Sequence, residues 1–271
     1  MSPLSPAVSA HPRRLRTRSR LGKYRIEALL AEGYYSNVYR AFDTIEGLRV
    51  ALKIPHPHLA DDSFLEGFRH EARLTAKIES PHLLSLKDAS VIDGHFVLAY
   101  PLGIESLADR LTRRLSTQNL AVIIEHCLEG LAVLHQQRIL HCDIKPENFI
   151  LFPGPSVRLA DFGIARIANR TLNASGSGTL GYMAPEQAMG KPSFRSDVFA
   201  MGLLFYRMLT KHLPEYPFAW PPPEIAKLRR KAHPEFIALI RKALEVSPRH
   251  RFRDADAFNK AFRQIRRRAL Y

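Results

Sequence analysis

The chemistry of this chain centres on four polar residues, Asp143, Lys145, Asn148 and Asp161, that follow one another at short intervals. The carboxylate of Asp143 can accept a proton from a hydroxyl group, and the ammonium group of Lys145 can neutralise a migrating phosphate. Asn148 and Asp161 offer hard oxygen ligands of the kind that Mg²⁺ prefers. In this order and spacing, the residue types are suited to phosphoryl transfer.

The motifs that carry these residues, HCDIKPEN and DFG, resemble those of the eukaryotic-like (Hanks-type) Ser/Thr protein kinases, especially the bacterial members. The resemblance extends over roughly residues 24–268. It implies transfer of the γ-phosphoryl group of Mg-ATP to Ser or Thr of a protein substrate. Asp143 would be the catalytic base, Asn148 and Asp161 the Mg²⁺ ligands, and Lys145 a phosphate contact typical of Ser/Thr specificity.

Three further catalytic residues follow from the resemblance. Lys53 in VALK would contact the α- and β-phosphates and pair with a glutamate on the following helix. Glu71 is the candidate partner, although Glu66 is expected on the same helix, and Lys53 could instead be a strand residue that extends to solvent. Thr179 in GTLGYMAPEQ would bridge Asp143 and Lys145.

The segment LLAEGYYSNVY resembles the glycine-rich loop that covers nucleotide phosphates with backbone N–H groups. Gly33 retains the second glycine position, while Ala31 and Ser36 occupy the first and third, which predicts a stiffer loop. Val38 would cap one side of the adenine, and Ala51 would also line the nucleotide site. A plain β-hairpin gives the same pattern, so this motif alone is weak.

The expected adenine-binding linker departs from the family pattern. If Leu98 is the gatekeeper, Pro101 stands where a backbone N–H normally binds adenine, and proline has none. Either the alignment is shifted by one residue, or adenine loses a hydrogen bond worth ~0.5–1.5 kcal/mol. The carbonyl of Ala99 remains an acceptor. This departure and the reduced glycine loop favour an alternative, a pseudokinase or scaffold with weak or no phosphotransfer.

Cys142 replaces the arginine that most relatives use to hold a phosphate on the activation loop. We therefore expect activity that does not depend on activation-loop phosphorylation. A redox role for the thiol is the alternative to a small buried residue. The resemblance also predicts a buried ion pair between Glu186 and Arg251, and hydrogen bonds from the catalytic-loop backbone to Asp197.

The elements that must position these groups change in kind along the chain. Short strand-like runs and one helix, starting near Ser63, fill the first part, and helical patterns dominate later, notably at 120–137 and 197–209. The fold class expected is α+β, the two-lobed protein-kinase fold with ATP in the cleft. Its predicted divisions are listed here: a disordered basic tail 1–22, a small β-rich lobe 23–100 and a helical lobe 101–271, with the kinase domain at 23–268.

The net charge of +14 is concentrated at the two ends. Residues 1–22 hold five arginines and no acid, and residues 227–271 hold fourteen basic and four acidic side chains. One interpretation is an anionic partner for the basic termini, and the other is a solvated tail and helix face. No nucleic-acid-binding signature is present, so binding of nucleic acid is not expected.

The remaining composition predicts a cytoplasmic protein without a membrane span. Two cysteines cannot build a disulfide framework, and no apolar run reaches the ~18 residues of a membrane helix. His56, His58 and His70 lie near one another in the sequence, but their spacing matches no known metal-ligand pattern. We expect them in a polar loop.

Overall fold

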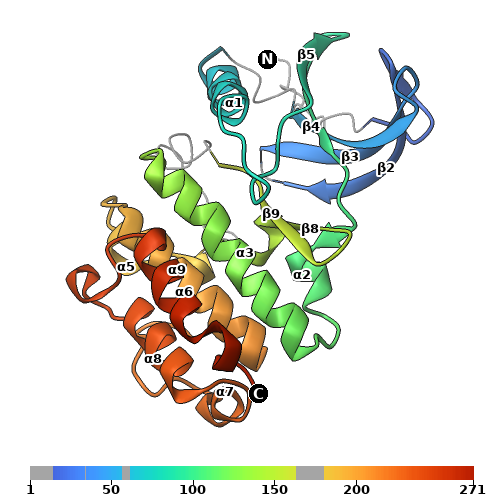
Figure 1. The fold of residues 1–271 in the computed structure, drawn as a ribbon. Coiled ribbons are helices and arrows are strands. Elements are labelled where there is room, and N and C mark those ends of the chain that lie inside the picture. The colour runs from blue at the N-terminus through green and yellow to red at the C-terminus, as the bar shows by residue number, and fades with distance from the viewer. Residues whose placement is uncertain (1–14, 34, 57–61, 163–179) are drawn as a thin grey trace, which may run out of the picture. The chain divides into compact units, whose positions relative to one another are not determined.

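The structure, a computed structural model, describes residues 15–33, 35–56, 62–162 and 180–271. Its contacts divide the chain into two compact units (Figure 1): Met1–Glu66 with Leu86–Leu102, and Gly67–Ser85 with Gly103–Tyr271. The first unit is rich in strands and the second in helices, which confirms the α+β class expected from the sequence.

The first unit is built on a six-stranded antiparallel sheet with the order β1-β2-β3-β4-β6-β5. Its strands are β1 (Arg20–Leu21), β2 (Tyr24–Glu32), β3 (Ser36–Asp43), β4 (Leu48–Pro55), β5 (Asp88–Ile92) and β6 (His95–Pro101). Because successive side chains of a strand point to opposite faces, alternate apolar residues gather on one face. Together they form the core of this unit: Leu21, Tyr24, Ile26, Tyr39, Ala41, Val50, Leu52, Ile54, Val97 and Ala99.

Ordered structure begins earlier than the sequence suggested. The tail was expected to be disordered through Gly22, but Leu21 pairs with Tyr24 and is only 2% exposed. A strand of two residues has no periodicity from which it could be predicted. The burial of Leu21 in the core of this unit explains why β1 stays paired with β2.

The segment Gly67–Ser85 groups with the helical unit, although the sequence placed it in the small lobe. Leu83 forms a parallel bridge with Leu159, and the backbone N–H of Leu159 donates to the carbonyl oxygen of His82 at 2.9 Å. These contacts join residues far apart in the sequence. Local patterns could not indicate them.

The second unit consists mainly of helices around one core. Helix α1 (Asp62–Thr75) enters it from Gly67 onward. The other helices are α2 (Leu107–Arg110), α3 (Thr117–Gln136), α5 (Pro185–Ala188), α6 (Phe194–Thr210), α7 (Ile225–Lys231), α8 (Pro234–Ala243) and α9 (Ala255–Ile265). The 3-10 turns are η2 (Pro146–Asn148), η3 (Leu180–Tyr182), η4 (Pro248–His250) and η5 (Arg266–Arg268). A small antiparallel sheet contains β7 (Glu105–Ser106), β8 (Phe149–Phe152) and β9 (Ser156–Leu159).

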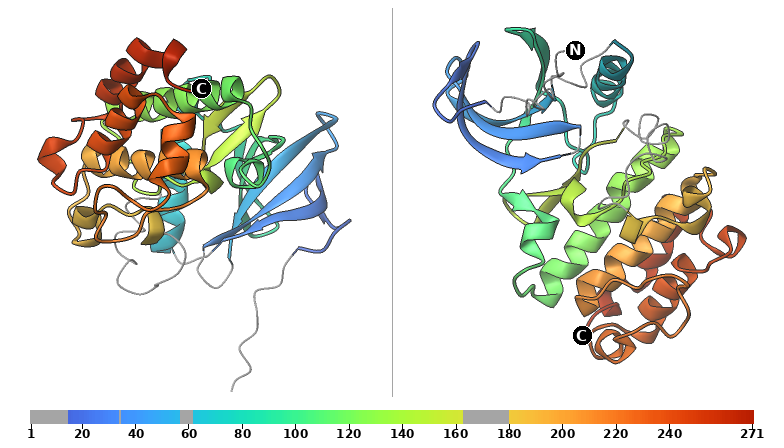
Figure 2. Two further views of the ribbon diagram at one scale, coloured as in Figure 1. Left: turned by 90° about the horizontal axis from the view of Figure 1, so that it is seen from below. Right: turned by 180° about the vertical axis from the view of Figure 1, so that it is seen from behind.

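Helix α3 runs through this unit beside α9 and β9, as both sets of views show (Figures 1 and 2). Its apolar positions are buried along one face, as their helical spacing predicted. The side chain of Ser116 accepts a hydrogen bond from the backbone N–H of Asn119 at 3.2 Å. Ser116 is therefore the N-cap, and Thr117 is the first helical residue.

Helix α6 is buried almost all round, as its continuous apolar sequence predicted. A capping box between Ser193 and Ser196 fixes its first turn, which carries Asp197. Within the part of the chain that the structure describes, no helix has the length and apolar composition needed to cross a bilayer.

Candidate active site

Lys145 and Asn148, two of the predicted site residues, converge on the carboxylate of Asp143, in the segment that follows α3 and ends in η2. The ammonium nitrogen of Lys145 lies 2.7 Å from Oδ2 of Asp143. The amide nitrogen of Asn148 donates to the same oxygen at 3.0 Å and to the backbone carbonyl of Asp143 at 2.7 Å. These contacts bring the three residues together within residues 141–148, a segment that we name the catalytic loop.

The second carboxylate oxygen of Asp143 has a different environment. Oδ1 is buried and has no hydrogen-bond partner among the described residues. A buried acceptor without a partner costs ~1–3 kcal/mol, so each one calls for an explanation, and a catalytic role is one. Oδ1 is therefore available to a group that arrives with a substrate, such as a hydroxyl.

Asp197 holds the backbone of the catalytic loop through hydrogen bonds to its carboxylate. Its carboxylate accepts the backbone N–H groups of His141 at 2.9 Å and Cys142 at 2.8 Å. Nε2 of His135 lies 3.0 Å from the same carboxylate, and Nδ1 of His135 accepts the backbone N–H of Ala255 at 3.0 Å. With Nδ1 an acceptor, the proton of His135 is on Nε2, which donates to Asp197. The predicted role of Asp197 is confirmed.

His141 links the catalytic loop to the segment that carries Asp161, a role that the sequence reasoning missed. Its side chain is fully buried, Nδ1 accepts the backbone N–H of Asp143 at 3.3 Å, and Nε2 donates to the carbonyl of Ala160 at 2.9 Å. The backbone N–H of Ala160 in turn donates to the carbonyl of Asn148 at 2.8 Å. The two proposed metal ligands, Asn148 and Asp161, are thus connected through the residue before Asp161.

The chemistry of these donors fits Mg²⁺. The amide nitrogen of Asn148 is committed to Asp143, which leaves its amide oxygen as the atom that can face a cation. Asp161 adds a carboxylate on a backbone with φ of 61°, a conformation rare for residues other than glycine. Together they provide hard oxygen ligands of the type that Mg²⁺ binds.

Cys142 is constrained both in its backbone and in its thiol. Its φ is 61°, and its carbonyl accepts the side-chain amide of Gln187 at 2.6 Å, another contact that the sequence did not reveal. Burial raises the pKa of the thiol to about 12, and the carboxylates of Asp197 and Asp143 add to the effect. A thiol in this state is poorly reactive, which favours the small buried residue over a redox switch.

Glu186 and Arg251 form the ion pair that was predicted. The two Nη atoms of Arg251 donate to the two carboxylate oxygens of Glu186 at 2.6 and 3.0 Å, and the arginine side chain is fully buried. Ser196 donates to the same carboxylate at 2.7 Å. Burial alone would raise the pKa of Glu186, but the hydrogen bonds from Arg251 and Ser196 outweigh it and hold the pKa below its usual range.

In the first unit, four of the residues predicted for nucleotide contact, Ala31, Val38, Ala51 and Lys53, share one face of the sheet. Ala31 pairs with Val38, and Val38 pairs with Lys53, so the three form one row across β2, β3 and β4. Ala51 lies two residues from Lys53 on the same strand and therefore on the same face. This is the face opposite the apolar core of the unit, and Lys53 is 4% exposed on it.

The turn after β2 is held to the end of β4. The backbone N–H of Gly33 donates to the carbonyl of Ser36 at 2.9 Å, and Nε2 of His56 donates to the carbonyl of Gly33 at 2.8 Å. His56 is buried. It is a structural hydrogen-bond donor to the proposed phosphate loop, whereas His58 lies outside the described residues.

The register of β6 places Leu98 directly opposite Lys53 and Pro101 opposite Val50. Pro101 ends the strand and offers no N–H. The carbonyl of Ala99 accepts the backbone N–H of Lys87 at 2.8 Å, which occupies one of its two lone pairs.

Two predicted catalytic residues remain, Glu71 and Thr179, and the structure describes only the first of them. Glu71 is 1% exposed whereas Glu66 is exposed, so burial favours Glu71 as the carboxylate that needs a cationic partner. Thr179 lies outside the described residues.

This chain resembles known proteins of one family, the protein kinases. The family model described as "Protein kinase domain" matches residues 24–262. The chain is 35% identical over 201 residues to the serine/threonine-protein kinase PknL of Mycobacterium tuberculosis, covering 71% of this chain and 50% of that protein. It is 32% identical over 269 residues to the serine/threonine-protein kinase pkn3 of Myxococcus xanthus, covering 87% of this chain and 48% of that protein. The chain thus spans about half the length of these curated relatives.

Solved structures agree with the sequence relatives. The kinase domain of Mycobacterium tuberculosis PknI superposes with a TM-score of 0.69 at 26% identity, over 93% of this chain and 99% of that one.

Proposed function

Because this chain belongs to the protein kinase family, and its relatives are bacterial Ser/Thr kinases, we propose that it transfers the γ-phosphoryl group of Mg-ATP to Ser or Thr of a protein substrate. The observation that carries the proposal is the convergence of Lys145 and Asn148 on Asp143, whose Oδ1 is left without a partner.

In the proposed reaction, Asp143 orients the substrate hydroxyl through Oδ1 and accepts its proton. Lys145, already paired with Oδ2, neutralises charge on the migrating phosphoryl group. Asn148 and Asp161 would hold Mg²⁺, which supplies charge neutralisation at the phosphate oxygens. Lys53 is the proposed contact of the α- and β-phosphates, with Glu71 as its carboxylate partner.

The nucleotide contacts proposed in the first unit are the row of Ala31, Val38 and Lys53, with Gly33 and Ser36 in the adjoining turn. The bond from His56 to Gly33 supports the stiff loop that the missing glycines predict. A stiff loop limits the cost of ordering it around phosphate.

The first test compares three variants of the purified chain. Asp143→Asn keeps the size of the side chain but removes the base, and Lys53→Met removes the phosphate contact. We expect each to lower phosphate transfer to a generic protein substrate by about 10²–10⁴-fold. Asp93→Asn, an exposed carboxylate in the turn between β5 and β6, is the matched control and should keep full activity.

Near wild-type transfer in Asp143→Asn would refute the proposed base. No transfer by the wild-type chain itself, with ATP binding retained, would favour the pseudokinase alternative, which rests on Pro101 and on the two replaced glycines.

We also propose that activity does not depend on phosphorylation of the activation loop. The supporting observation is Cys142, whose thiol carries no positive charge and whose carbonyl is held by Gln187. We expect the initial rate to be unchanged when the chain is treated with a phosphatase that is then removed. A collapse of that rate, with a mock-treated sample as control, would contradict this part of the proposal.

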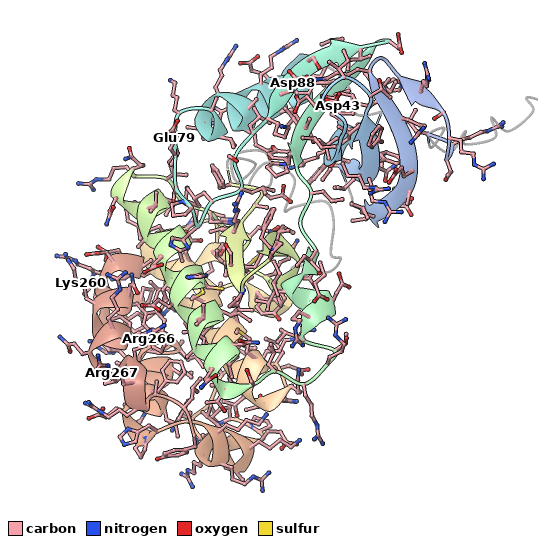
Figure 3. The ribbon with its side chains drawn as sticks, turned by 45° about the vertical axis from the view of Figure 1, so that its right-hand side comes forward. Asp43, Glu79, Asp88, Lys260, Arg266 and Arg267 are labelled. Carbon is pink, nitrogen blue, oxygen red and sulfur yellow. The ribbon has the colours of Figure 1, made fainter. Side chains whose placement is uncertain are left out.

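Ion pairs within the chain weaken the argument that the basic C-terminal region binds an anionic partner. Arg263, Arg266 and Arg268 pair with the chain's own glutamates. Lys260, Arg266 and Arg267 point outward along the last helical segment, as a solvated face would (Figure 3).

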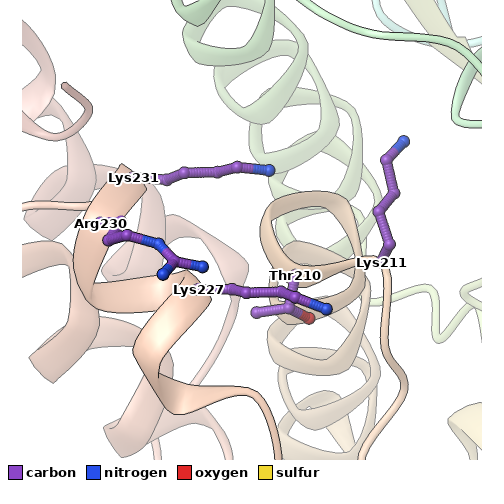
Figure 4. A pocket seen from close by; sticks show the side chains of 5 residues that line it. All are labelled: Thr210, Lys211, Lys227, Arg230 and Lys231. Carbon is purple, nitrogen blue, oxygen red and sulfur yellow. The ribbon is translucent and has the colours of Figure 1, made fainter.

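A cavity of about 330 Å³ offers a more specific place for an anion (Figure 4). Its lining is Thr210, Lys211, Lys227, Arg230 and Lys231. Lys211 donates to the carbonyl of Leu111, however, and Lys231 donates to the carbonyl of Leu209 at 2.7 Å. Lys227 in turn pairs with Glu224 at 3.0 Å. We therefore place the proposed anionic contact at Arg230, and we expect it to be weak and sensitive to salt.

A further inference from the structure

A cluster of metal-ligating side chains lies in the second unit, apart from the catalytic loop. His82 comes from the segment between α1 and β5, and His126 and Glu129 come from one side of α3. One nitrogen or oxygen atom from each residue lies within 4.8 Å of the other two. The kinase reaction proposed above uses none of these residues.

The hydrogen bonding of the two imidazoles is incomplete. Nδ1 of His82 and Nδ1 of His126 are both buried, and neither has a hydrogen-bond partner. The rings are close neighbours, with centroids 4.6 Å apart. Buried polar nitrogens without a partner are costly, and neither ring is fixed by a hydrogen bond at Nδ1, so both rings can turn toward an ion.

The backbone around the cluster is held firmly. The carbonyl oxygen of His82 would lie 2.6 Å from a Cβ atom at Gly130, so only glycine permits this approach of the segment to α3. That carbonyl also accepts the backbone N–H of Leu159 at 2.9 Å. The side chains can therefore adjust around a fixed frame.

The carboxylate of Glu129 is oriented for coordination. Oε2 lies 2.8 Å from Nε2 of His82, and the other oxygen accepts a hydrogen bond from Arg263 of α9. A second group that hydrogen-bonds a ligating carboxylate is the usual means of fixing a metal ligand. Arg263 would keep this role while Oε2 turned to an ion.

The donor set selects the class of ion. Two imidazoles and one carboxylate suit Zn²⁺, whereas Mg²⁺ prefers oxygen ligands only. Zn²⁺ with bonds of about 2.0–2.1 Å places tetrahedral ligands roughly 3.3 Å apart, so the side chains must move inward by about 1 Å.

We propose that His82, His126 and Glu129 form a Zn²⁺ site, with water at the fourth position, that fastens the segment around His82 to α3. The side chains of His82 and Glu129 are 20% and 17% exposed, so an ion can reach them from solvent. The role of the ion is structural. Leu83, next to His82, forms a bridge with Leu159 at the end of β9, the strand that precedes Asp161.

The experiment uses the whole chain, stripped with EDTA, and measures the melting temperature while Zn²⁺ or Mg²⁺ is added. We expect Zn²⁺ at about a hundredfold excess over its Kd to raise the melting temperature by roughly 5 °C, and Mg²⁺ to have no such effect. Metal analysis after dialysis should show about one more equivalent of zinc on the wild type than on His126→Asn. His95→Asn, on β6 in the other unit, is the control for surface histidines and should behave as wild type.

Glu129→Gln serves as a second variant if His126→Asn fails to fold, and Co²⁺ serves as a second probe. A tetrahedral Co²⁺ absorption band in the wild type that disappears in either variant supports the site. Equal zinc content and equal thermal shifts in the wild type, His126→Asn and Glu129→Gln would overturn it. Because none of these readouts measures phosphate transfer, the result is independent of the proposed kinase activity.

Discussion

At the scale of single residues, the catalytic loop contains both strongly paired groups and a polar atom without a hydrogen-bond partner among the described residues. Lys145 and Asn148 satisfy one oxygen of Asp143, and the other oxygen is buried without a partner. Cys142 and Asp161 both have φ near 61°, in the left-handed region where side chains other than glycine are strained. Such features persist only where surrounding contacts hold them, and here Asp197 and His141 provide those contacts.

The environment of Cys142 leads to a prediction about its reactivity. With a pKa of about 12, only about one molecule in 10⁵ carries the thiolate at pH 7. We expect iodoacetamide at pH 7 to leave Cys142 and the buried Cys127 unmodified in the folded chain and to modify both after denaturation, as peptide mass spectrometry would report. Rapid labelling of Cys142 in the folded chain would revive the redox-switch interpretation.

The residues that the sequence identified are those whose chemistry lies in short motifs. Asp197 and the pair of Glu186 with Arg251 were predicted because each stands in a recognisable motif, and the hydrogen bonds confirm both. His141 and Gln187 were missed as positioning residues, although they lie within the motifs HCDIKPEN and GTLGYMAPEQ. Their partners are backbone atoms, and backbone contacts leave no residue-type signature in the sequence.

At the scale of elements, one buried guanidinium connects several parts of the second unit. Arg251, at the end of η4, pairs with Glu186 of α5. It also donates to three backbone carbonyls at 2.6–3.0 Å, those of Arg195, Glu245 and Val246. Its guanidinium lies 4.5 Å from the centre of the Phe199 ring on α6. The side chain thus joins α5, the start of α6 and the segment after α8.

Loss of one partner of this pair should destabilise the fold strongly. Arg251→Met leaves the carboxylate of Glu186 buried without its cation, which typically costs about 3–5 kcal/mol. Glu186→Gln keeps two hydrogen-bonding atoms and should cost less than Arg251→Met. Chemical unfolding of the three proteins at neutral pH measures both differences, and equal stability of Arg251→Met and wild type would contradict the assigned role.

The same pair predicts a pH dependence with a definite sign. The pKa of Glu186 is lower in the folded chain than in the unfolded chain, because burial is outweighed by the bonds from Arg251 and Ser196. A group with a lowered folded pKa binds more protons when unfolded, so its contribution is complete above its unfolded pKa of about 4.5 and is lost as the pH falls through the folded value. Glu186→Gln should therefore show a shallower loss of stability than wild type below about pH 5.

At the scale of the whole molecule, the described residues form two separate apolar cores. The smaller lies on one face of the six-stranded sheet, and the larger surrounds α3 and α6. The change from strand-like to helical periodicity along the sequence predicted both kinds of element. The sequence did not reveal that Gly67–Ser85 belongs with the larger core, because Leu83 reaches β9 through a contact of long sequence separation.

Two cores predict that the units can lose structure separately. Leu52 of β4 and Leu204 of α6 are both fully buried, one in each core, and replacement of either by alanine should cost about 2–5 kcal/mol in its own unit. Hydrogen exchange with mass spectrometry distinguishes the two: Leu52→Ala should accelerate exchange in β2, β3 and β4 while α3 and α6 stay protected. The reverse should hold for Leu204→Ala. Equal acceleration of exchange in both units by either variant would contradict this and mean that the chain unfolds as one cooperative body. Only then would a cavity in one core lower the free energy of unfolding for residues that do not contact it.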